Sequence, residues 1–212
     1  MKPKLICIVG ETASGKDCVT NEAIARITDY IIRPVCSYTD RPMRVNEVDG
    51  VEHYFVTTEE FNKLKKDRES DLLAYTCIKK ENSPNSNGYQ YMAFNDELYK
   101  SHIYIIDYLG LQDLRHRYGD TIDIVVVYIY APLETRMNRA KIRSDFSTSF
   151  SNRVTAEEAQ FQKFRSSKQY DYKLNNLDGV FDLTVNRLCN IIKYELIKNP
   201  VENMPFPTPK NK

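Results

Sequence analysis

The sequence predicts an α/β protein in which a parallel β-sheet is flanked by helices. Two nearly continuous apolar runs, residues 4–9 (KLICIV) and 122–130 (IDIVVVYIY), have the composition of strands that are buried on both faces. Each run is followed by a segment that reads as a helix, so strands and helices alternate along the chain. With 212 residues, of which 42% are hydrophobic, the chain is long enough to bury a sizeable core.

The elements follow one another in a simple order. The strand at 4–9 leads to a helix over 17–28, in which apolar residues recur at helical spacing, and a short strand is expected near 34–38. A polar, aromatic and turn-rich stretch from 39 to 95 then interrupts the alternation, and SPNSNG at 83–88 is its clearest loop signal. Alternation resumes with a strand at 103–106, a helix at about 110–118 and the strand at 122–130. Residues 132–166 then read as a helix, a Ser-rich break and a second helix, and a last helix is expected at 181–198.

Composition excludes several classes of protein. A formal net charge of +1 gives no electrostatic reason to expect binding to nucleic acid or to a membrane surface, and no apolar run approaches the roughly eighteen residues of a membrane span. The five cysteines are scattered and never form C-x-x-C, which is typical of reduced thiols in a cytoplasmic protein. We expect a cytoplasmic monomer or homodimer. Residues 199–212 contain four prolines and are expected to be extended or disordered.

A phosphate-binding loop is predicted directly after the first strand. Residues 10–16 (GETASGK) match the pattern G-x-x-x-x-G-K and precede a helix. Small residues let backbone N–H groups surround a phosphate, and the helix N-terminus adds its positive end. Lys16 would reach the β- and γ-phosphates of ATP. The ATP-binding residues expected from this segment are Gly10, Thr12, Ala13, Ser14, Gly15, Lys16, Asp17 and Cys18.

Two aspartates are candidate ligands for Mg²⁺. Asp17 stands where a Ser or Thr usually supplies the Mg²⁺ ligand, so its carboxylate either replaces that ligand or acts through a metal-bound water. Asp107 follows the strand at 103–106, where it could present a carboxylate to Mg²⁺ or its waters. The alternative for Asp107 is a helix N-cap, which is chemically equally reasonable. The expected cofactors are therefore ATP and Mg²⁺.

Residues 37–61 (SYTDRPMRVNEVDGVEHYFVTTEEF) resemble the acceptor-binding segment of guanylate kinases, approximately S-x-T-T-R-x-P-R-x-G-E-x-x-G-x-x-Y-x-F-V-x-x-x-E-F. A weaker resemblance extends over about residues 4–198. It implies a P-loop core at about 1–36 and 96–198, a small acceptor-binding domain inserted at about 37–95, and a helical lid at about 136–155. Proteins of this family transfer the γ-phosphoryl group of ATP to a nucleoside monophosphate.

The same resemblance suggests an acceptor site. Arg41 and Arg44 stand three residues apart, and two guanidinium groups can grip a phosphate dianion with bidentate hydrogen bonds. This chain has His53 at the tyrosine position of the family, with Tyr54 beside it, so either ring could meet the phosphate. By resemblance, the acceptor-binding residues are Ser37, Arg41, Arg44, His53, Tyr54, Tyr91 and Asp107.

The predicted lid contributes further arginines. Arg136, Arg139 and Arg143 recur at helical spacing, and phosphoryl transfer requires positive charge around the transferred group. A solvated basic helix face is the alternative interpretation. By resemblance, Arg139, Arg143 and Arg153 close over the γ-phosphate and join Lys16 and Arg41 as the catalytic set. The segment YDYKLNNLD at 170–178 resembles the one that packs on adenine in the family, which adds Asn176 to the ATP-binding residues.

Two departures from the family pattern concern the acceptor base. Ala74 aligns with the glutamate that usually reads guanine, and Ala93 aligns with a serine of the same site. A site without these polar partners loses discrimination between bases. Asp71, Glu69 or Glu81 could substitute if the alignment shifts.

The sequence therefore predicts a kinase for GMP or dGMP. Another (d)NMP or a phosphorylated ribose such as ribose 1,5-bisphosphate is the alternative acceptor. The Gly-Lys-Asp ending of the loop resembles those of ribose bisphosphate kinases, some phage deoxynucleotide kinases and phosphomevalonate kinases. A non-catalytic, guanylate-kinase-like interaction domain is the second alternative, but such domains have typically lost the phosphate loop and its lysine, which this chain retains at Lys16.

Overall fold

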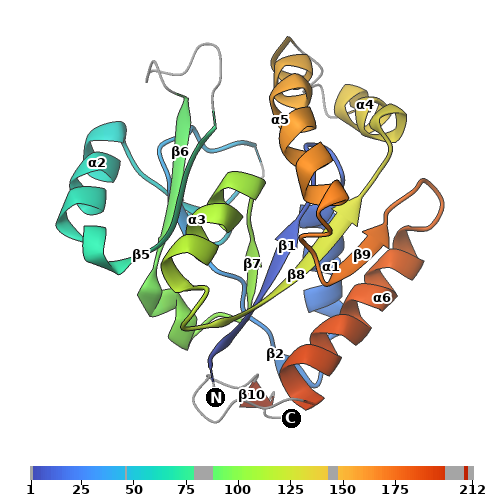
Figure 1. The fold of residues 1–212 in the computed structure, drawn as a ribbon, viewed down its shortest axis with the longest axis horizontal. Helices are drawn as coiled ribbons and strands as arrows, with labels where there is room; N and C mark the ends of the chain where they lie inside the picture. Colours follow the sequence, from blue (N-terminus) through green and yellow to red (C-terminus); the bar gives the residue numbers. More distant parts are fainter. Residues whose placement is uncertain (1, 46, 79–87, 143–147, 199–207, 210–212) are drawn as a thin grey trace.

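The computed structural model describes residues 2–45, 47–78, 88–142, 148–198 and 208–209. Within these residues the central sheet has four parallel strands in the order β7-β1-β8-β9 (Figure 1). Parallel neighbours need crossover connections, which helices supply. The predicted α/β class with a parallel sheet is confirmed. The strands are β1 (Lys4–Val9), β7 (Ile103–Ile105), β8 (Asp123–Tyr130) and β9 (Tyr172–Asn175).

Helices cover both faces of this sheet. On one face α1 (Lys16–Arg26) and α6 (Phe181–Lys193) pack against Ile6, Ile8 and Val127. On the other face α3 (Tyr108–Tyr118) and α5 (Thr148–Ser166) pack against Cys7 and Tyr128. Alternate residues of β1 and β8 thus enter different clusters, which is why both strands are nearly continuous apolar runs.

Several boundaries differ from those expected. The strand expected near 34–38 is β3 (Ser37–Thr39), and Pro34 forms only an isolated bridge to Ile103. Helix α3 begins two residues early because Asp107 caps it. The last helix changes to a π-helical turn (Tyr194–Lys198). In the Pro-rich tail, β10 (Thr208–Pro209) pairs with β2 (Tyr30–Ile31), while residues 199–207 and 210–212 lie outside the described residues.

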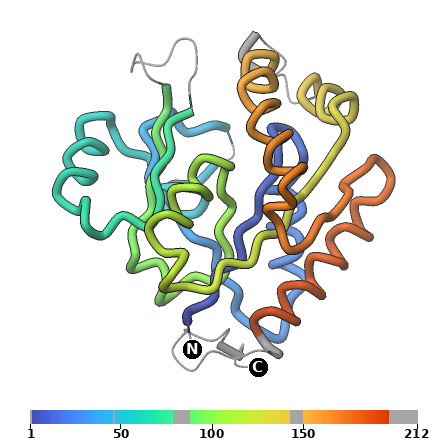
Figure 2. The backbone as a smooth tube through the Cα atoms, in the orientation of Figure 1, coloured from blue at the N-terminus to red at the C-terminus, as the bar shows by residue number. Residues whose placement is uncertain are grey.

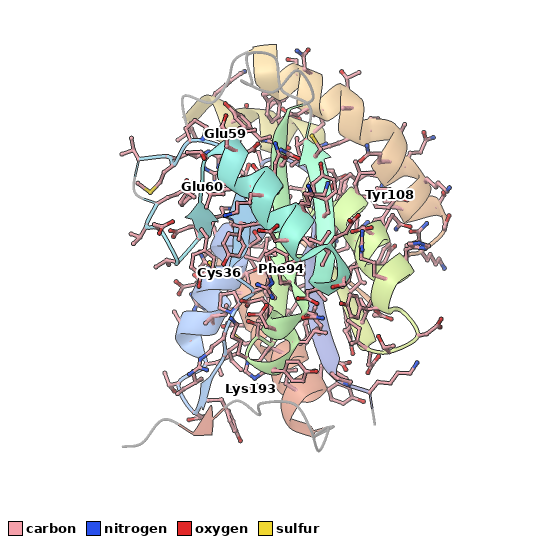
Figure 3. All side chains as sticks on the ribbon, turned by 90° about the vertical axis from the view of Figure 1, so that its left-hand side faces the viewer. Cys36, Glu59, Glu60, Phe94, Tyr108 and Lys193 are labelled. Atoms are coloured by element: carbon pink, nitrogen blue, oxygen red, sulfur yellow. The ribbon has the colours of Figure 1, made fainter. Side chains whose placement is uncertain are left out.

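A second sheet is formed within the interrupting stretch. Its strands, in the order β4-β3-β6-β5, are β3, β4 (His53–Phe55), β5 (Leu72–Ile78) and β6 (Tyr89–Phe94). Helix α2 (Thr58–Asp67) covers one face, where Phe61, Met92 and Phe94 are buried. A capping box between Thr57 and Glu60 starts this helix. Figure 3 views the molecule from the side on which α2 lies. Short 3₁₀ turns (Glu69–Asp71 and Asn95–Tyr99) flank β5 and β6, and residues 79–87 of the predicted loop lie outside the described residues.

The second sheet and the segment expected to form the lid lie on either side of the end of the central sheet at which β1 and β8 finish (Figure 2). The lid segment includes α4 (Leu133–Ile142) and the first part of α5, and its Ser-rich break at 143–147 lies outside the described residues. Among the described helices, none is long and apolar enough to cross a membrane.

Candidate active site

The loop between β1 and α1 has the tight geometry that a phosphate site requires. A Cβ on Gly10 would lie 2.5 Å from the carbonyl oxygen of Ile129, so a larger residue does not fit there. Gly15 has a φ of 85°, and a Cβ on it would lie 2.5 Å from Nδ2 of Asn176. Helix α1 begins directly afterwards, so its unpaired amides and positive end adjoin the loop.

The carbonyl groups of the loop are held by side chains from outside it. Arg136 is buried and donates to the carbonyl of Thr12 at 3.3 Å. Arg139 and Nδ2 of Asn176 both donate to the carbonyl of Ser14, at 3.1 and 2.8 Å. A phosphate would be repelled by carbonyl oxygens and attracted by N–H groups, so anchoring the carbonyls in this way suits an anion site. Arg136 was not assigned a role from sequence, although it lies one helical turn before Arg139.

The predicted lid arginines occupy different positions. Arg139 also donates to the carbonyl of Asn176 and to Asp178, so in this structure it joins the loop to the β9–α6 connection. Arg153 lies 3.9 Å from Glu157, and its Nε is buried without a hydrogen-bond partner among the described residues. Arg143 lies outside the described residues. Contact of these arginines with a γ-phosphate remains a prediction.

Helix α5 contacts the phosphate loop through the carboxylate of Glu157, a contact that was not predicted from the sequence. Oε2 of Glu157 accepts a hydrogen bond of 2.8 Å from the amide of Thr12, and Oε1 accepts one of 2.5 Å from its hydroxyl. A second acid, Glu11, is buried within the loop itself, where Tyr128 and Arg165 donate to it. Burial raises the pKa of Glu11, and these donors and nearby arginines oppose the rise. No sequence signal pointed to either contact, because the partners are more than a hundred residues apart.

Lys16 lies beside Asp17, and its charge also acts on Asp107, the second predicted metal ligand. Its Nζ is 3.5 Å from Oδ2 of Asp17, whose side chain is 56% exposed, while Cys18 next to it is exposed. Oδ1 of Asp107 accepts from the amides of Leu109 and Gly110, at 2.9 and 3.0 Å, so this aspartate is the N-cap of α3. Burial raises the pKa of Asp107, and these bonds and the charge of Lys16 oppose the rise. Among the described residues, no three His, Cys, Asp or Glu side chains form a preformed metal cluster.

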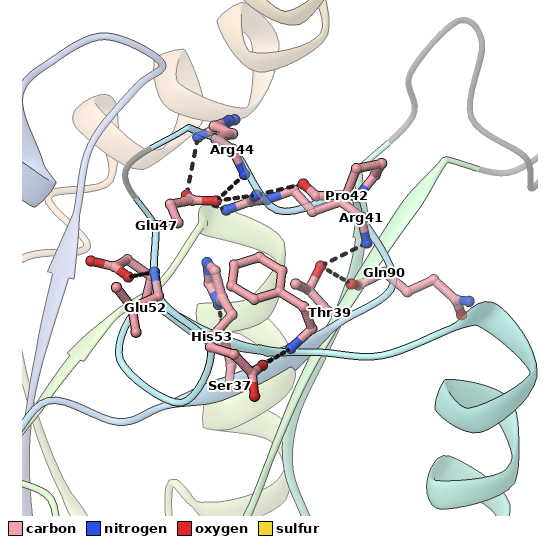
Figure 4. Close-up of polar contacts among 12 residues, drawn as sticks. Ser37, Thr39, Arg41, Pro42, Arg44, Glu47, Glu52, His53 and Gln90 are labelled. Carbon is pink, nitrogen blue, oxygen red and sulfur yellow. Dashed lines mark hydrogen bonds and ion pairs between the residues drawn. The ribbon is translucent and has the colours of Figure 1, made fainter.

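The two predicted phosphate-binding arginines meet at Glu47 (Figure 4). Arg41 is buried, and its NH1 and NH2 each donate to one oxygen of Glu47 at 2.7 Å. The amide of Arg44 donates to the same carboxylate at 2.8 Å, while its own side chain is 55% exposed. Burial opposes ionisation of Glu47, but the bonds from Arg41 and Arg44 outweigh it and lower the pKa of Glu47. Sequence reasoning missed Glu47, although it is the glutamate of the R-x-G-E part of the family pattern.

His53, rather than Tyr54, faces the side of the sheet that carries Ser37. Nδ1 of His53 lies 2.8 Å from Oγ of Ser37, and its ring centroid is 5.5 Å from that of Tyr91. Tyr54 instead stacks on Tyr38, with ring centroids 4.8 Å apart, on the face covered by α2. Neighbouring residues of a strand point to opposite faces, so His53 and Tyr54 cannot both face the same ligand.

The protonation of His53 should be visible in the pH dependence of stability. Burial, and then the charge of Arg41, lowers the pKa of His53 from 6.5 to about 4, while Asp17 and Glu47 act in the opposite direction. A histidine that is neutral when folded stabilises the protein above its unfolded pKa, and this stability is lost as the pH falls from about 6.5 towards 4. Between pH 7 and pH 5 we expect this residue to account for a loss of about 2 kcal/mol.

The measurement is the free energy of unfolding in urea, at pH 7 and pH 5, for the wild type and His53→Gln. The variant should lose about 2 kcal/mol less than the wild type on acidification. His116→Gln, at an exposed position, should behave as the wild type does. An unchanged pH dependence in His53→Gln would show that this side chain is not held neutral by the fold.

The positions that read guanine in the family pattern are apolar in this structure. Ala74 and Ala93 are cross-strand partners, and each is 1% exposed within the main core. Glu69 and Asp71 lie in the turn before β5, so neither belongs to the strand that carries Ala74. Glu81 lies outside the described residues. Strand β5 itself (LLAYTCI) carries no acidic residue.

Comparison with known proteins agrees with this geometry. The family model described as guanylate kinase matches residues 2–195. The chain belongs to the guanylate kinase family. It is 30% identical over 181 residues to a guanylate kinase of Symbiobacterium thermophilum, covering 84% of this chain and 80% of that protein. It is also 27% identical over 203 residues to a guanylate kinase of Rickettsia typhi, covering 93% and 94% of the two chains.

A solved guanylate kinase shares the fold. The crystal structure of guanylate kinase from Anaplasma phagocytophilum matches with a TM-score of 0.59 and 21% identity, and covers 93% of this chain and 89% of that one. The guanylate kinase family consists of nucleotide-directed phosphotransferases, so the chain is an enzyme of the nucleoside monophosphate kinase class. This agrees with the prediction of a kinase rather than of an interaction domain.

Proposed function

We propose that this enzyme transfers the γ-phosphoryl group of Mg·ATP to a nucleoside monophosphate, with GMP and dGMP as its principal acceptors. One observation supports the proposal: the phosphate loop and the arginine clamp formed by Arg41 and Arg44 are near enough for charges on the loop to act on groups beside the clamp. The charge of Asp17, in α1, acts on His53 beside Arg41, and the charge of Lys16 acts on Asp107, which Thr76 of the second sheet contacts at 3.2 Å. Donor and acceptor phosphates bound at these two places would face each other.

Each part of the site has a distinct task in this proposal. The loop amides and Lys16 hold the phosphates of ATP, while Arg139 and Asn176 keep the loop carbonyls turned to the protein. Arg41 donates from NH1 to Glu47 and to the carbonyl of Pro42, and from NH2 to Glu47. With its remaining N–H groups, and together with Arg44, it would hold the acceptor phosphate in line with the γ-phosphate. Neutral His53, oriented by Ser37, has its second ring nitrogen available to the same phosphate.

The residues around the loop fit a magnesium ion. Mg²⁺ favours oxygen ligands and is usually bound by one or two carboxylates together with substrate phosphates and waters. Asp17 offers a largely exposed carboxylate beside Lys16, and Asp107 uses only Oδ1 for its hydrogen bonds to described residues. When bound, the ion would neutralise charge on the phosphates during transfer. Asp17 and Asp107 are therefore the residues that would hold it.

An alternative acceptor is favoured by one specific observation. Because Ala74 and Ala93 are buried and apolar, β5 and β6 do not supply the two polar groups with which the family pattern reads guanine. Discrimination against other bases should then be weaker than in a site with both groups. Another (d)NMP is the second candidate acceptor, and a phosphorylated ribose such as ribose 1,5-bisphosphate is the third.

A coupled assay across acceptors tests the proposal. We expect kcat/KM at saturating Mg·ATP to be highest for GMP or dGMP, with AMP, dTMP and dUMP lower by less than about a thousandfold. Activity confined to ribose 1,5-bisphosphate would overturn the proposal of a nucleotide acceptor. The roles assigned to the phosphate loop and to the arginine clamp would still hold. A preference for GMP above a thousandfold would indicate a guanine-reading group beyond Ala74 and Ala93, and Glu81 would be the first residue to replace.

A further inference from the structure

Helix α5 has two parts with different surroundings. From Phe161 onward the helix packs in the main core, where Phe161 and Phe164 are buried. Residues 151–159, in the first part, are all exposed or half-buried. This first part belongs to the segment expected to form the lid, and it carries Arg153. A residue that fixes the first part of α5 to the core would therefore set where Arg153 lies.

Glu157 joins the first part of α5 to the phosphate loop. Its two oxygens accept hydrogen bonds from the amide and the hydroxyl of Thr12, at 2.8 and 2.5 Å. Thr12 is a firm anchor, because Arg136 holds its carbonyl group. The next residue, Ala13, has a φ of 62°, a left-handed conformation that persists only where the surroundings fix it. Two hydrogen bonds to a charged acceptor thus tie a largely exposed stretch of helix to a fixed point of the loop.

The same carboxylate lies beside Arg153. The two residues are one helical turn apart, and NH2 of Arg153 is 3.9 Å from Oε1 of Glu157. Nε of Arg153 is buried and has no hydrogen-bond partner among the described residues. A buried guanidinium N–H needs an acceptor, and a phosphate oxygen matches its charge. Glu157 therefore contacts the loop on one side and, on the other, the arginine that has a donor to spare.

We propose that Glu157 is a positioning residue, which fixes α5 to Thr12 and thereby holds Arg153 in reach of the phosphoryl group that is transferred. The inference rests on the proposed function, because it concerns Arg153 at the γ-phosphate of ATP. Lys16 and the amides at the start of α1 do not take part in the contact, so they stay available for ATP. Loss of Glu157 should therefore slow transfer more than it weakens the binding of either nucleotide.

The test is a double-mutant cycle for Glu157 and Arg153, measured by steady-state kinetics with Mg·ATP and GMP. Glu157→Ala should lower kcat about tenfold, while KM for ATP and KM for GMP change less than about threefold. Arg153→Ala should itself be about a hundredfold slower than the wild type. In that background Glu157→Ala should change kcat less than about twofold, because a residue that acts through Arg153 has no effect without it.

Two further variants separate positioning from folding. Glu157→Gln should keep kcat within about threefold of the wild type, because an amide can accept from the Thr12 amide and donate to its hydroxyl oxygen. Thr12→Val removes the hydroxyl bond from the loop side and should also lower kcat, but only when Arg153 is present. Thermal unfolding identifies the variants that fold. If Glu157→Ala does not fold, Thr12→Val carries the same cycle.

The neighbouring residue Glu158 provides a matched control. It is exposed and accepts a hydrogen bond of 3.1 Å from Arg165, so Glu158→Ala removes the same charge from α5 without touching Thr12, and kcat should stay within about twofold. An unchanged or higher kcat in Glu157→Ala, or an equal loss with and without Arg153, would overturn the inference alone. A wild type that phosphorylates no nucleoside monophosphate would overturn the proposed function, and the inference with it.

Discussion

Replacement of Lys16 by alanine is expected to lower kcat about a thousandfold while the fold remains intact. The lysine is the first residue of α1, directly after the glycine with positive φ at position 15, and its half-buried side chain places the ammonium group 3.5 Å from Asp17. Its side chain does not belong to the hydrophobic clusters of the described residues. The positive charge is thus available for the phosphates of ATP, and its loss removes stabilisation of the charge that develops during transfer.

The measurement pairs steady-state turnover with thermal unfolding. Lys16→Ala should unfold within a few degrees of the wild type, since it removes no core contact. Lys66→Ala, at an exposed position on α2, provides the control with the same change of charge and should keep full activity. Comparable ATP turnover by purified Lys16→Ala would refute the phosphate-loop assignment and the proposed kinase activity with it.

Replacement of Asp17 by alanine should lower turnover by about a hundredfold or more and raise the concentration of Mg²⁺ needed for half-maximal rate. The physical reason is the loss of a charged oxygen ligand at the place where most phosphate loops supply a hydroxyl. Asp17→Ser restores a neutral oxygen ligand and should therefore recover part of the activity. Titration of MgCl₂ at fixed ATP for the wild type and both variants measures the effect.

A control for Asp17 lies on the same helix. Glu22 pairs with Arg26, and Glu22→Ala removes an acidic residue of α1 without touching the loop, so its Mg²⁺ dependence should match that of the wild type. If Asp17→Ala also kept the wild-type Mg²⁺ dependence, Asp17 would have no role at the metal. Asp107 would then be the remaining candidate ligand among the two acids considered.

Elements that depend on neighbouring residues could be predicted from the sequence. Strand β1 and the loop that follows it combine an apolar run with two glycines at fixed spacing, and both signals are contained in residues 4–16. The parallel sheet followed from the continuous apolar run of β8, because a strand buried on both faces needs no alternation. The predicted ends of helices and strands were less accurate. Helix α3 was expected from about residue 110 but begins at Tyr108, because the side chain of Asp107 accepts hydrogen bonds from the amides at its start.

Predictions that depended on strand orientation could not be completed from the sequence. His53 and Tyr54 were both candidate ligands of the acceptor phosphate, because the sequence does not say which of two adjacent strand residues faces which side of the sheet. Pairing of β4 with β3 decides it by placing His53 opposite Ser37 and Tyr54 opposite Tyr38. In the same way, the bulge in β5 between Leu72 and Ala74 turns Ala74 towards the main core, which only the paired strands reveal.

By itself, the sequence determined the α/β class, the phosphate loop with Lys16, and the pair of arginines at 41 and 44, because each depends on residue types at short, fixed spacing. Only the tertiary structure decided what those groups touch: Glu47 on Arg41, Glu157 on Thr12, Arg136 behind the loop and Thr76 on Asp107. Hydrogen bonds and ion pairs act over a few ångströms in space. Most of these partners lie tens of residues apart or more, so no local pattern encodes them, and folding of the two sheets is what brings them together.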